Sequence, residues 1–204
     1  MAKNARYCTP YRRRREGRTN YRTRRNLVLS RVPRLVARSS LKNIVAEIVV
    51  AKPEGDRVLV SAHSKELAKK FGWKASRKNL SAAYLTGLLC GLRAKEANIK
   101  QTNLDIGLHT PSKGAAIFSV LRGVLDAGVN VAHSEEKLPD KKRIEGEHIA
   151  DYAKNLSTTP EEYQARFSKY LSQKLTPEDF PKHFAEVKAN VLAAYPAASG
   201  GKKA

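Results

Sequence analysis

The stretch "NIVAEIVVAKPEGDRVLVSAHS", residues 43–64, restricts the possible folds of this chain more than any other part of the sequence. Two runs rich in valine and isoleucine flank a short polar segment, in which Pro53 and Gly55 favour a tight turn. This pattern predicts a β-hairpin. Residues 32–40, "VPRLVARSS", are also typical of a strand and directly precede the hairpin, so we expect three antiparallel strands.

The middle of the chain alternates helix and strand patterns. Residues 77–97 repeat apolar side chains at helical spacing, residues 102–108 alternate like a strand, and residues 115–128 form an amphipathic helical pattern before the short strand-like run "VNVAHS". Strands separated by helices in this order predict a parallel part of the sheet that helices cover. We therefore expect an α/β domain with a mixed sheet over residues 27–155.

Two glycines, Gly87 and Gly91, lie four residues apart within the predicted helix 77–97. Such a pair permits another backbone to approach closely, or it permits close packing of the helix against the sheet. The second interpretation is the commoner one for a helix of a soluble protein, and we expect it here.

The last fifty residues are helical in pattern. Thr159-Pro160-Glu161-Glu162 and Thr176-Pro177-Glu178-Asp179 each place Thr at the N-cap, Pro at the first helical position and an acid at the third, close to a capping box. Both should begin short amphipathic helices. The first of these should bury Phe167, Tyr170 and Leu171. Residues 156–204 are thus expected to form a helical C-terminal extension.

The charge of the chain is large and unevenly placed. The formal net charge is +20, and residues 1–40 alone carry thirteen Lys and Arg against one acid, whereas residues 151–204 carry eight against six. Such an excess points to a polyanionic partner, either nucleic acid or an anionic membrane surface. The amino end should hold the binding face.

Residues 11–26, "YRRRREGRTNYRTRRN", form an arginine-rich arm with eight arginines, no lysine and two tyrosines. The arm has no apolar face, so we expect it to be extended and to order on its partner. Arginine binds phosphate with two parallel hydrogen bonds and stacks on bases, and Tyr11 and Tyr21 add stacking rings. This bias favours RNA over a lipid surface. The alternative is a solvated basic tail or a targeting signal, but RNA binding is the better interpretation because the charge and aromatic content together exceed what a signal needs.

A second candidate for phosphate binding is "HTPSKG", residues 109–114. Ser112 offers a hydroxyl, Lys113 a positive charge, and Gly114 is expected to open the following helix. Backbone N–H groups at a helix N-terminus bind phosphate well. An ordinary strand-to-helix loop explains the same residues equally well.

Catalytic and metal-binding patterns are weak. The five histidines have no metal-ligand spacing, and the sequence contains neither a nucleophile-elbow motif nor a phosphate-cradling loop of the P-loop type. "HSEEKLPD", residues 133–140, groups one histidine with three acids, but a solvated acidic loop is the better interpretation. We expect no enzyme activity, no metal and no cofactor.

The remaining features indicate an intracellular protein. Cys8 and Cys90 lie far apart and form no metal-binding pair, so both are expected to be reduced thiols. No apolar run approaches the length of a membrane span, and no signal-peptide pattern follows Met1. We expect a soluble, cytoplasmic protein without a membrane partner.

Several segments, in this order, closely resemble a known family. They are "RRRREGRTNYRTRRNLV", "NLSAAYLTGLLCGLRA", "LDAGVNVAHSEEKLPD", "HIADYAKNL" and "LTPEDF". The chain is similar, over about residues 6–190, to the universal large-subunit ribosomal protein that binds 5S rRNA, numbered eighteen in bacterial and five in eukaryotic nomenclature. It most resembles archaeal members, because the longer eukaryotic segment between "LDIGL" and "SKG" is missing.

The resemblance implies a fold, a function and partners. The fold would be ribonuclease-H-like, with a mixed sheet and helices on both faces. The function would be to bind 5S rRNA and dock it onto 23S rRNA in the central protuberance, beside neighbouring ribosomal proteins. A general protein for structured RNA outside the ribosome is the alternative. A nuclease of the same fold would need a metal-binding carboxylate on its first strand, and residues 34–40 contain no Asp or Glu.

The resemblance also implies which residues contact RNA. The family's arm maps onto Arg12, Arg13, Arg14, Arg15, Arg18, Tyr21, Arg22, Arg24 and Arg25, to which the stacking argument adds Tyr11. Four further residues follow only from their expected position on the RNA face, namely Arg38, Lys42, Ser112 and Lys113. The arm would comprise residues 1–26.

Overall fold

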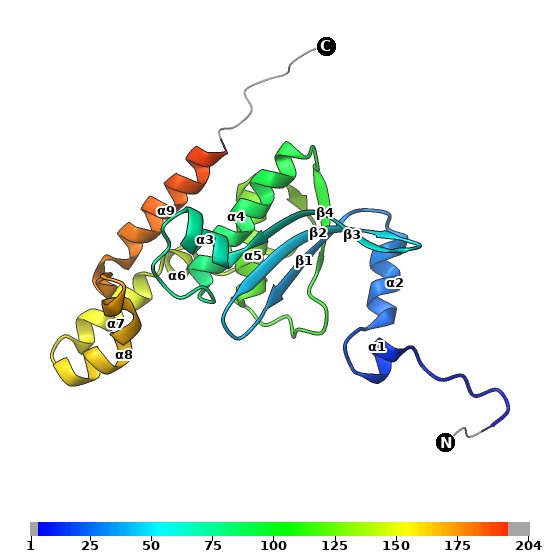
Figure 1. Ribbon diagram of the computed structural model, residues 1–204, viewed down its shortest axis with the longest axis horizontal. Helices are drawn as coiled ribbons and strands as arrows, with labels where there is room; N and C mark the ends of the chain where they lie inside the picture. The colour runs from blue at the N-terminus through cyan, green and yellow to red at the C-terminus, as the bar shows by residue number, and fades with distance from the viewer. Residues whose placement is uncertain (1–3, 196–204) are drawn as a thin grey trace, which may run out of the picture.

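The computed structural model describes residues 4–195, which form a five-stranded mixed sheet with helices around it (Figure 1). The strand order is β3-β2-β1-β4-β5. The first three strands are antiparallel, and β4 and β5 run parallel beside β1. The expected α/β class, with an antiparallel meander followed by a parallel part, is confirmed. The strands are β1 (Arg34–Ser39), β2 (Ile44–Lys52), β3 (Gly55–His63), β4 (Gln101–Asp105) and β5 (Asn130–Val131).

The hairpin of β2 and β3 forms where the sequence predicts it. Pro53 and Glu54 make the turn, and Gly55 adopts a positive φ of 148°, a conformation that favours glycine. The register shifts between Ile48 and Val49, which marks a bulge in β2.

One face of the sheet carries the core. Side chains that alternate along β1, β2 and β3 are buried there, namely Leu35, Ala37, Ile44, Ala46, Ile48, Val60 and Ala62. Helix α4 (Leu80–Glu96) packs on β2 and β3, and helix α5 (Ala116–Asp126) packs on β1 and β5. Both predicted helices are therefore confirmed, and both cover the same face.

The glycines of α4 face α5 rather than the sheet. A methyl group added at Gly87 would collide with the backbone of Val120, and one added at Gly91 would meet Ala127 and the backbone of Val124. The prediction that these glycines pack against the sheet is therefore wrong, and they instead allow the close approach of another backbone, that of α5. The two helix backbones approach each other because glycine on α4 faces the backbone of α5, and Gly123 of α5 in turn faces α4.

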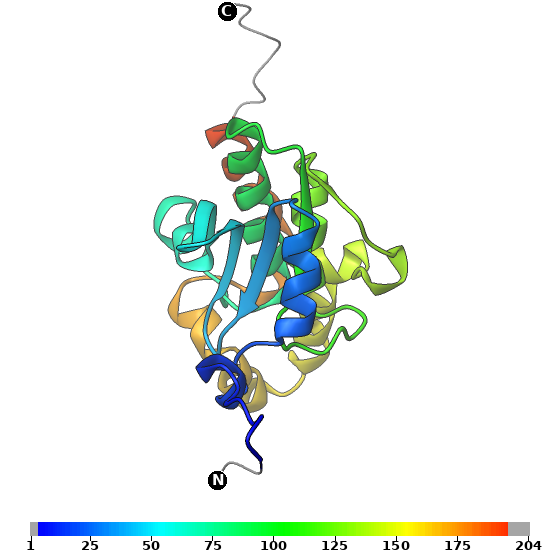
Figure 2. The same cartoon turned by 90° about the vertical axis from the view of Figure 1, so that its right-hand side faces the viewer.

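The arm is helical rather than extended over two segments, which corrects the expectation. These are α1 (Arg12–Arg15) and α2 (Tyr21–Leu29). The side chain of Asn20 accepts hydrogen bonds from the backbone N–H groups of Arg22 and Thr23, and so caps α2. Figure 2 shows α2 alongside the sheet, on the side away from α4, so that helices lie on both faces.

The C-terminal part is helical, as predicted. Both threonines precede a helix start, but neither side chain caps it; instead, the Thr176 hydroxyl donates to the Asp179 carboxylate at 2.6 Å. Phe167 is buried, whereas Leu171 is exposed, so its predicted burial is wrong: α8 packs through a narrow stripe. The helices are α6 (Lys141–Glu145), α7 (Glu147–Leu156), α8 (Pro160–Ser172), the 3-10 turn η2 (Pro177–Asp179) and α9 (Phe180–Ala194).

Helix α9 joins the C-terminal extension to the α/β body. Phe180, Phe184 and Val187 belong to the same buried cluster as the core of the sheet. Helix α3 (Ser64–Lys70), which the sequence patterns did not predict, lies between β3 and α4. Helices α2 and α7 run across the predicted domain limits at residues 26 and 155, and these limits stay predictions.

Candidate nucleic-acid interface

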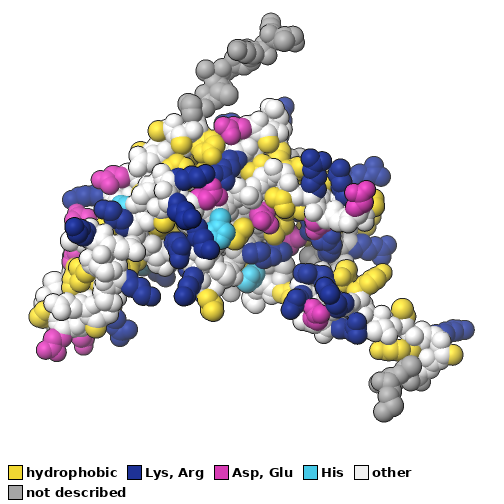
Figure 3. Space-filling model, in the orientation of Figure 1, with side chains coloured by type: hydrophobic (Ala, Val, Ile, Leu, Met, Phe, Trp, Pro, Cys, Tyr) yellow, Lys and Arg dark blue, Asp and Glu magenta, His cyan; other side chains and the backbone are white. Residues whose placement is uncertain are grey.

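The arginines of α1 are all exposed. None of Arg12–Arg15 is buried, and Figure 3 shows Lys and Arg side chains gathered over this end of the molecule. The single acid of the segment, Glu16, lies 3.7 Å from Arg12 Nε and 3.3 Å from Arg18 Nε. Such exposed pairs hold their partners weakly, so the arginines stay available to a polyanion.

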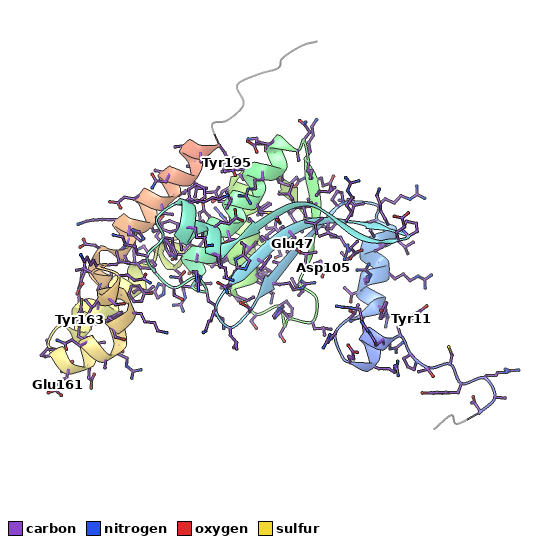
Figure 4. The ribbon with its side chains drawn as sticks, viewed as in Figure 1. Tyr11, Glu47, Asp105, Glu161, Tyr163 and Tyr195 are labelled. Carbon is purple, nitrogen blue, oxygen red and sulfur yellow. The ribbon has the colours of Figure 1, made fainter. Side chains whose placement is uncertain are left out.

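Tyr11 and Tyr21 form a pair of aromatic rings at the base of α1. Their ring centroids lie 5.1 Å apart at an interplanar angle of 38°. Tyr11 is 71% exposed, and it projects from the arm, away from the sheet (Figure 4). An exposed ring beside several guanidinium groups offers a surface on which an RNA base can stack.

The arginines of α2 divide into two groups. Arg22 and Arg25 are exposed on its outer side. Arg24 points to the sheet, where its Nη1 and Nη2 donate to the two carboxylate oxygens of Asp56 at 2.8 and 2.6 Å. This two-bond geometry is the strong form of an arginine–carboxylate pair.

Asp56 begins a chain of charged groups that crosses the sheet. Its Oδ2 accepts a second hydrogen bond, at 2.8 Å, from Arg34, whose side chain is only 3% exposed. Arg34 also donates to Asp105 Oδ2 at 2.8 Å, and Arg38 donates to Asp105 Oδ1 at 3.0 Å. Positive and negative groups therefore alternate from α2 through β3 and β1 to β4.

The pKa values of the two acids reflect these partners. The hydrogen bond from Arg24, helped by Arg34, lowers the pKa of Asp56 to about 2. Burial raises the pKa of Asp105, but the hydrogen bond and charge of Arg38 outweigh burial, and the pKa ends below its ordinary value. Both carboxylates are ionised at neutral pH.

A cleft of about 980 Å³ lies between the arm and the open face of the sheet. Val36, Val49 and Val58 contribute apolar side chains to it, and Arg13, Arg18 and other arm residues line its opposite side. Glu47 and Asp105 lie on this sheet face (Figure 4). Apolar side chains beside guanidinium groups suit a nucleic acid, which presents bases and phosphates together.

The two remaining predicted segments lie together. Lys42 is exposed in the β1–β2 loop, and Ser112 and Lys113 are exposed in the β4–α5 loop. A second hollow of about 650 Å³ is lined by other residues of these two loops, among them Leu41 and Thr110, and by Lys78; Lys42, Ser112 and Lys113 do not line it. His109 lines both hollows, so the arm cleft and the loop hollow are neighbours at this residue.

The expected helix start at Gly114 is displaced. Helix α5 begins at Ala116, and its N-cap residue, Ala115, makes no side-chain cap. Gly114 instead takes a positive φ of 71° and donates its N–H to the Lys137 carbonyl at 3.1 Å. Ser112 and Lys113 therefore lie in the loop before the helix.

The sequence analysis missed Arg34, Asp56 and Lys78, which also line the two hollows. In the sequence, Arg34 has the pattern of an ordinary strand residue and Asp56 that of a turn residue, because no local feature of the sequence indicates their partners. Within residues 4–195, no group of three or more His, Cys, Asp or Glu is placed to hold a metal ion. No helix among these residues is long and apolar enough to span a membrane.

Part of the chain that includes this surface matches a known protein family. Residues 5–103 match the model of the family described as "Ribosomal large subunit proteins 60S L5, and 50S L18". The match spans the arm, β1 to β3, α3, α4 and the start of β4, and it therefore includes most residues that line the arm cleft. The chain belongs, through residues 5–103, to this family of large-subunit ribosomal proteins.

Proposed function

We propose that this ribosomal protein binds 5S rRNA and docks it onto 23S rRNA in the central protuberance of the large subunit. The observation that carries the proposal is the concentration of exposed arginine and tyrosine on the arm, beside a cleft lined by both apolar and charged side chains. Family membership supports ribosomal RNA and ribosomal proteins as partners, and it supports a location in the cytoplasmic ribosome.

Three parts of the chain share this work in the proposal. Residues 1–26 bind RNA phosphates and stack on bases, residues 27–155 present the basic sheet face and loops, and residues 156–204 contact neighbouring proteins. The charge distribution supports this division, because the excess of Lys and Arg falls from the amino end to the C-terminal part. Tyr11 and Glu161 lie at opposite ends of the molecule (Figure 4).

The RNA-contacting residues of the proposal fall into two sets. The exposed set contains Tyr11, Arg12, Arg13, Arg14, Arg15, Arg18, Arg22, Arg25, Lys42, Ser112 and Lys113, and the half-buried set contains Tyr21, Arg24 and Arg38. Members of the exposed set are free to reach phosphate directly. Arg24 and Arg38 already bind carboxylates, so they contribute more to shaping the surface.

A structural rather than catalytic role is part of the proposal. Members of the matched family are ribosomal constituents. The carboxylate of Asp105 lies beside the guanidinium groups of Arg34 and Arg38, which neutralise the charge that a catalytic metal would need. Strand β1 carries no acid.

The test is a gel-shift titration with 5S rRNA against tRNA, at several salt concentrations. The full chain should prefer 5S rRNA. A truncation that starts at Asn20 keeps the cap of α2 but removes α1, and one that starts at Val32 removes both helices. Each should weaken binding in turn and flatten the salt dependence, since fewer phosphates are neutralised. Equal affinity of the full chain for 5S rRNA and tRNA would contradict the proposal and favour a general role with structured RNA.

A further inference from the structure

An acid lies within the basic arm cleft. Asp56 is the first residue after the turn glycine of β3, and its side chain is 32% exposed. A carboxylate on a surface that binds RNA repels the phosphates, so its presence calls for a compensating role. Its contacts indicate this role: among the described residues, Asp56 is the only acid that accepts hydrogen bonds from a side chain of α2.

Helix α2 has little else to hold it. None of its residues is buried, so the hydrophobic effect contributes little to its position. Its own cap, Asn20, stabilises the helix without attaching it to the sheet. Beyond the helix end, the side chain of Asn103 donates to Ser30 Oγ at 3.0 Å, which fixes only the C-terminal end.

Asp56 is itself fixed from the side of the sheet. Arg34 is almost fully buried and donates to Asp56 and Asp105 at 2.8 Å each. Asp105 is held in turn by Arg38 and by the backbone N–H of Gly107, at 3.0 and 2.9 Å. The carboxylate that receives Arg24 therefore has a set orientation before any RNA arrives.

We propose that Asp56 is a positioning residue for RNA binding: its pair with Arg24 holds α2 against the sheet, so that the outward arginines meet RNA in a fixed arrangement. This inference rests on the proposed function. Arg24 then acts through Asp56 rather than on phosphate. Ordering the arm beforehand lowers the entropy that binding must otherwise supply, and so increases affinity.

For the loss of Asp56, the proposal predicts a change of RNA affinity that is opposite in sign to the change expected from simple electrostatics. Replacing Asp56 by Asn removes a negative charge near the RNA, which alone would tighten binding. Removal of the clamp should instead weaken 5S rRNA binding about tenfold, in the range of one charge-assisted hydrogen-bonded pair. The affinity should fall at every salt concentration with a nearly parallel salt dependence, because the phosphate-binding arginines are still present.

Glu54 offers a matched control. It is an exposed acid two residues away, in the turn of the same hairpin, and it makes no ion pair among the described residues. Glu54→Gln removes the same charge without touching α2. Its affinity should stay unchanged or rise by up to about twofold.

The experiment compares the full chain with Asp56→Asn, Glu54→Gln, Arg24→Gln and the Asp56→Asn/Arg24→Gln double variant, by the same 5S rRNA titration. If Arg24 acts through Asp56, the double variant should bind as weakly as either single variant and no more weakly. Asp56→Asn binding as tightly as the wild type, or additive decreases of affinity in the double variant, would overturn the inference.

A measurement without RNA keeps the two proposals distinguishable. Amide hydrogen exchange of residues 21–29 in the free protein should speed up in Asp56→Asn and Arg24→Gln but not in Glu54→Gln, while exchange in α4 stays unchanged. Unchanged exchange in α2 would overturn the clamp by itself. If the wild-type chain failed to bind 5S rRNA, the proposed function would fall, and the exchange data would still decide whether Asp56 positions the helix.

Discussion

The imidazole of His183 stacks on the indole of Trp73, with ring centroids 5.2 Å apart and an interplanar angle of 24°. His183 Nε2 also accepts a hydrogen bond from the backbone N–H of Lys74 at 3.1 Å. Phe180 meets the same indole edge-on at 5.7 Å. These contacts attach α9 to the segment between α3 and α4, and so join the C-terminal extension to the body.

Acid should loosen this attachment. Burial lowers the pKa of His183 below its ordinary value of 6.5, and Nε2 must be unprotonated to accept the Lys74 N–H. A lowered pKa means that the full stability is present above pH 6.5 and declines as the pH falls below it. Trp73 is the only tryptophan, so its fluorescence should change over this range.

The variant His183→Gln is the control, because glutamine keeps an acceptor but does not titrate. Its Trp73 emission should be flat between pH 7 and pH 5. His63 and His148 also have lowered pKa values, so some pH dependence of overall stability will persist in this variant. If His183→Gln showed the same pH-dependent change of fluorescence as the wild type, another group would control the contact.

Inserting a methyl group between the closely packed helices α4 and α5 should destabilise the fold. Alanine at Gly87 would collide with the backbone of Val120, which cannot rotate away. We expect Gly87→Ala to lower the free energy of unfolding by about 1–3 kcal/mol or more, measured by urea denaturation.

Gly91→Ala provides the comparison, because its nearest neighbour is the side chain of Ala127. A second change, Ala127→Gly, should restore part of the stability that Gly91→Ala removes. No corresponding side-chain change can rescue Gly87→Ala. Equal stability of Gly87→Ala and the wild type would mean that the two helices can separate at no cost.

The exposed arginines of the arm should determine the salt dependence of RNA binding. Replacing Arg14 and Arg15 by Gln should lower the slope of log affinity against log salt by roughly 0.7–0.9 for each phosphate that is no longer neutralised. Replacing both by Lys should keep the slope but weaken binding, since lysine cannot make two parallel bonds to phosphate. Arg166→Gln/Lys169→Gln, on α8, removes the same charge far from the arm and should leave the slope unchanged.

The two cysteines should differ sharply in reactivity. Cys8 is exposed on the arm, whereas Cys90 is buried in α4, where burial raises the pKa of its thiol to about 12. A thiol-specific reagent should therefore label one cysteine per native chain and two after denaturation. Cys8→Ser should abolish the native labelling. Rapid labelling of both thiols without denaturant would contradict the burial of Cys90.

Local patterns predicted the elements that depend on local chemistry. The hairpin around Pro53 and Gly55 and the helices α4 and α5 follow from turn residues and apolar periodicity, and all three are confirmed. Helix α3 was missed although it carries a local signal. His63 Nδ1 accepts a hydrogen bond from the Lys65 N–H, and the Glu66 carboxylate accepts one from the His63 N–H, a capping box in which histidine replaces the usual serine or threonine.

The sequence by itself determined an antiparallel meander followed by a parallel part of the sheet, the placement of positive charge at the amino end and the membership of the chain in a ribosomal family. Only the tertiary structure decided which arginines are free and which are bound. Arg24 and Asp56 are 32 residues apart in the chain, and Arg34 and Asp105 are 71 apart. Their pairing depends on the strand register and on the approach of α2 to the sheet, and neither leaves a periodic signal in the sequence.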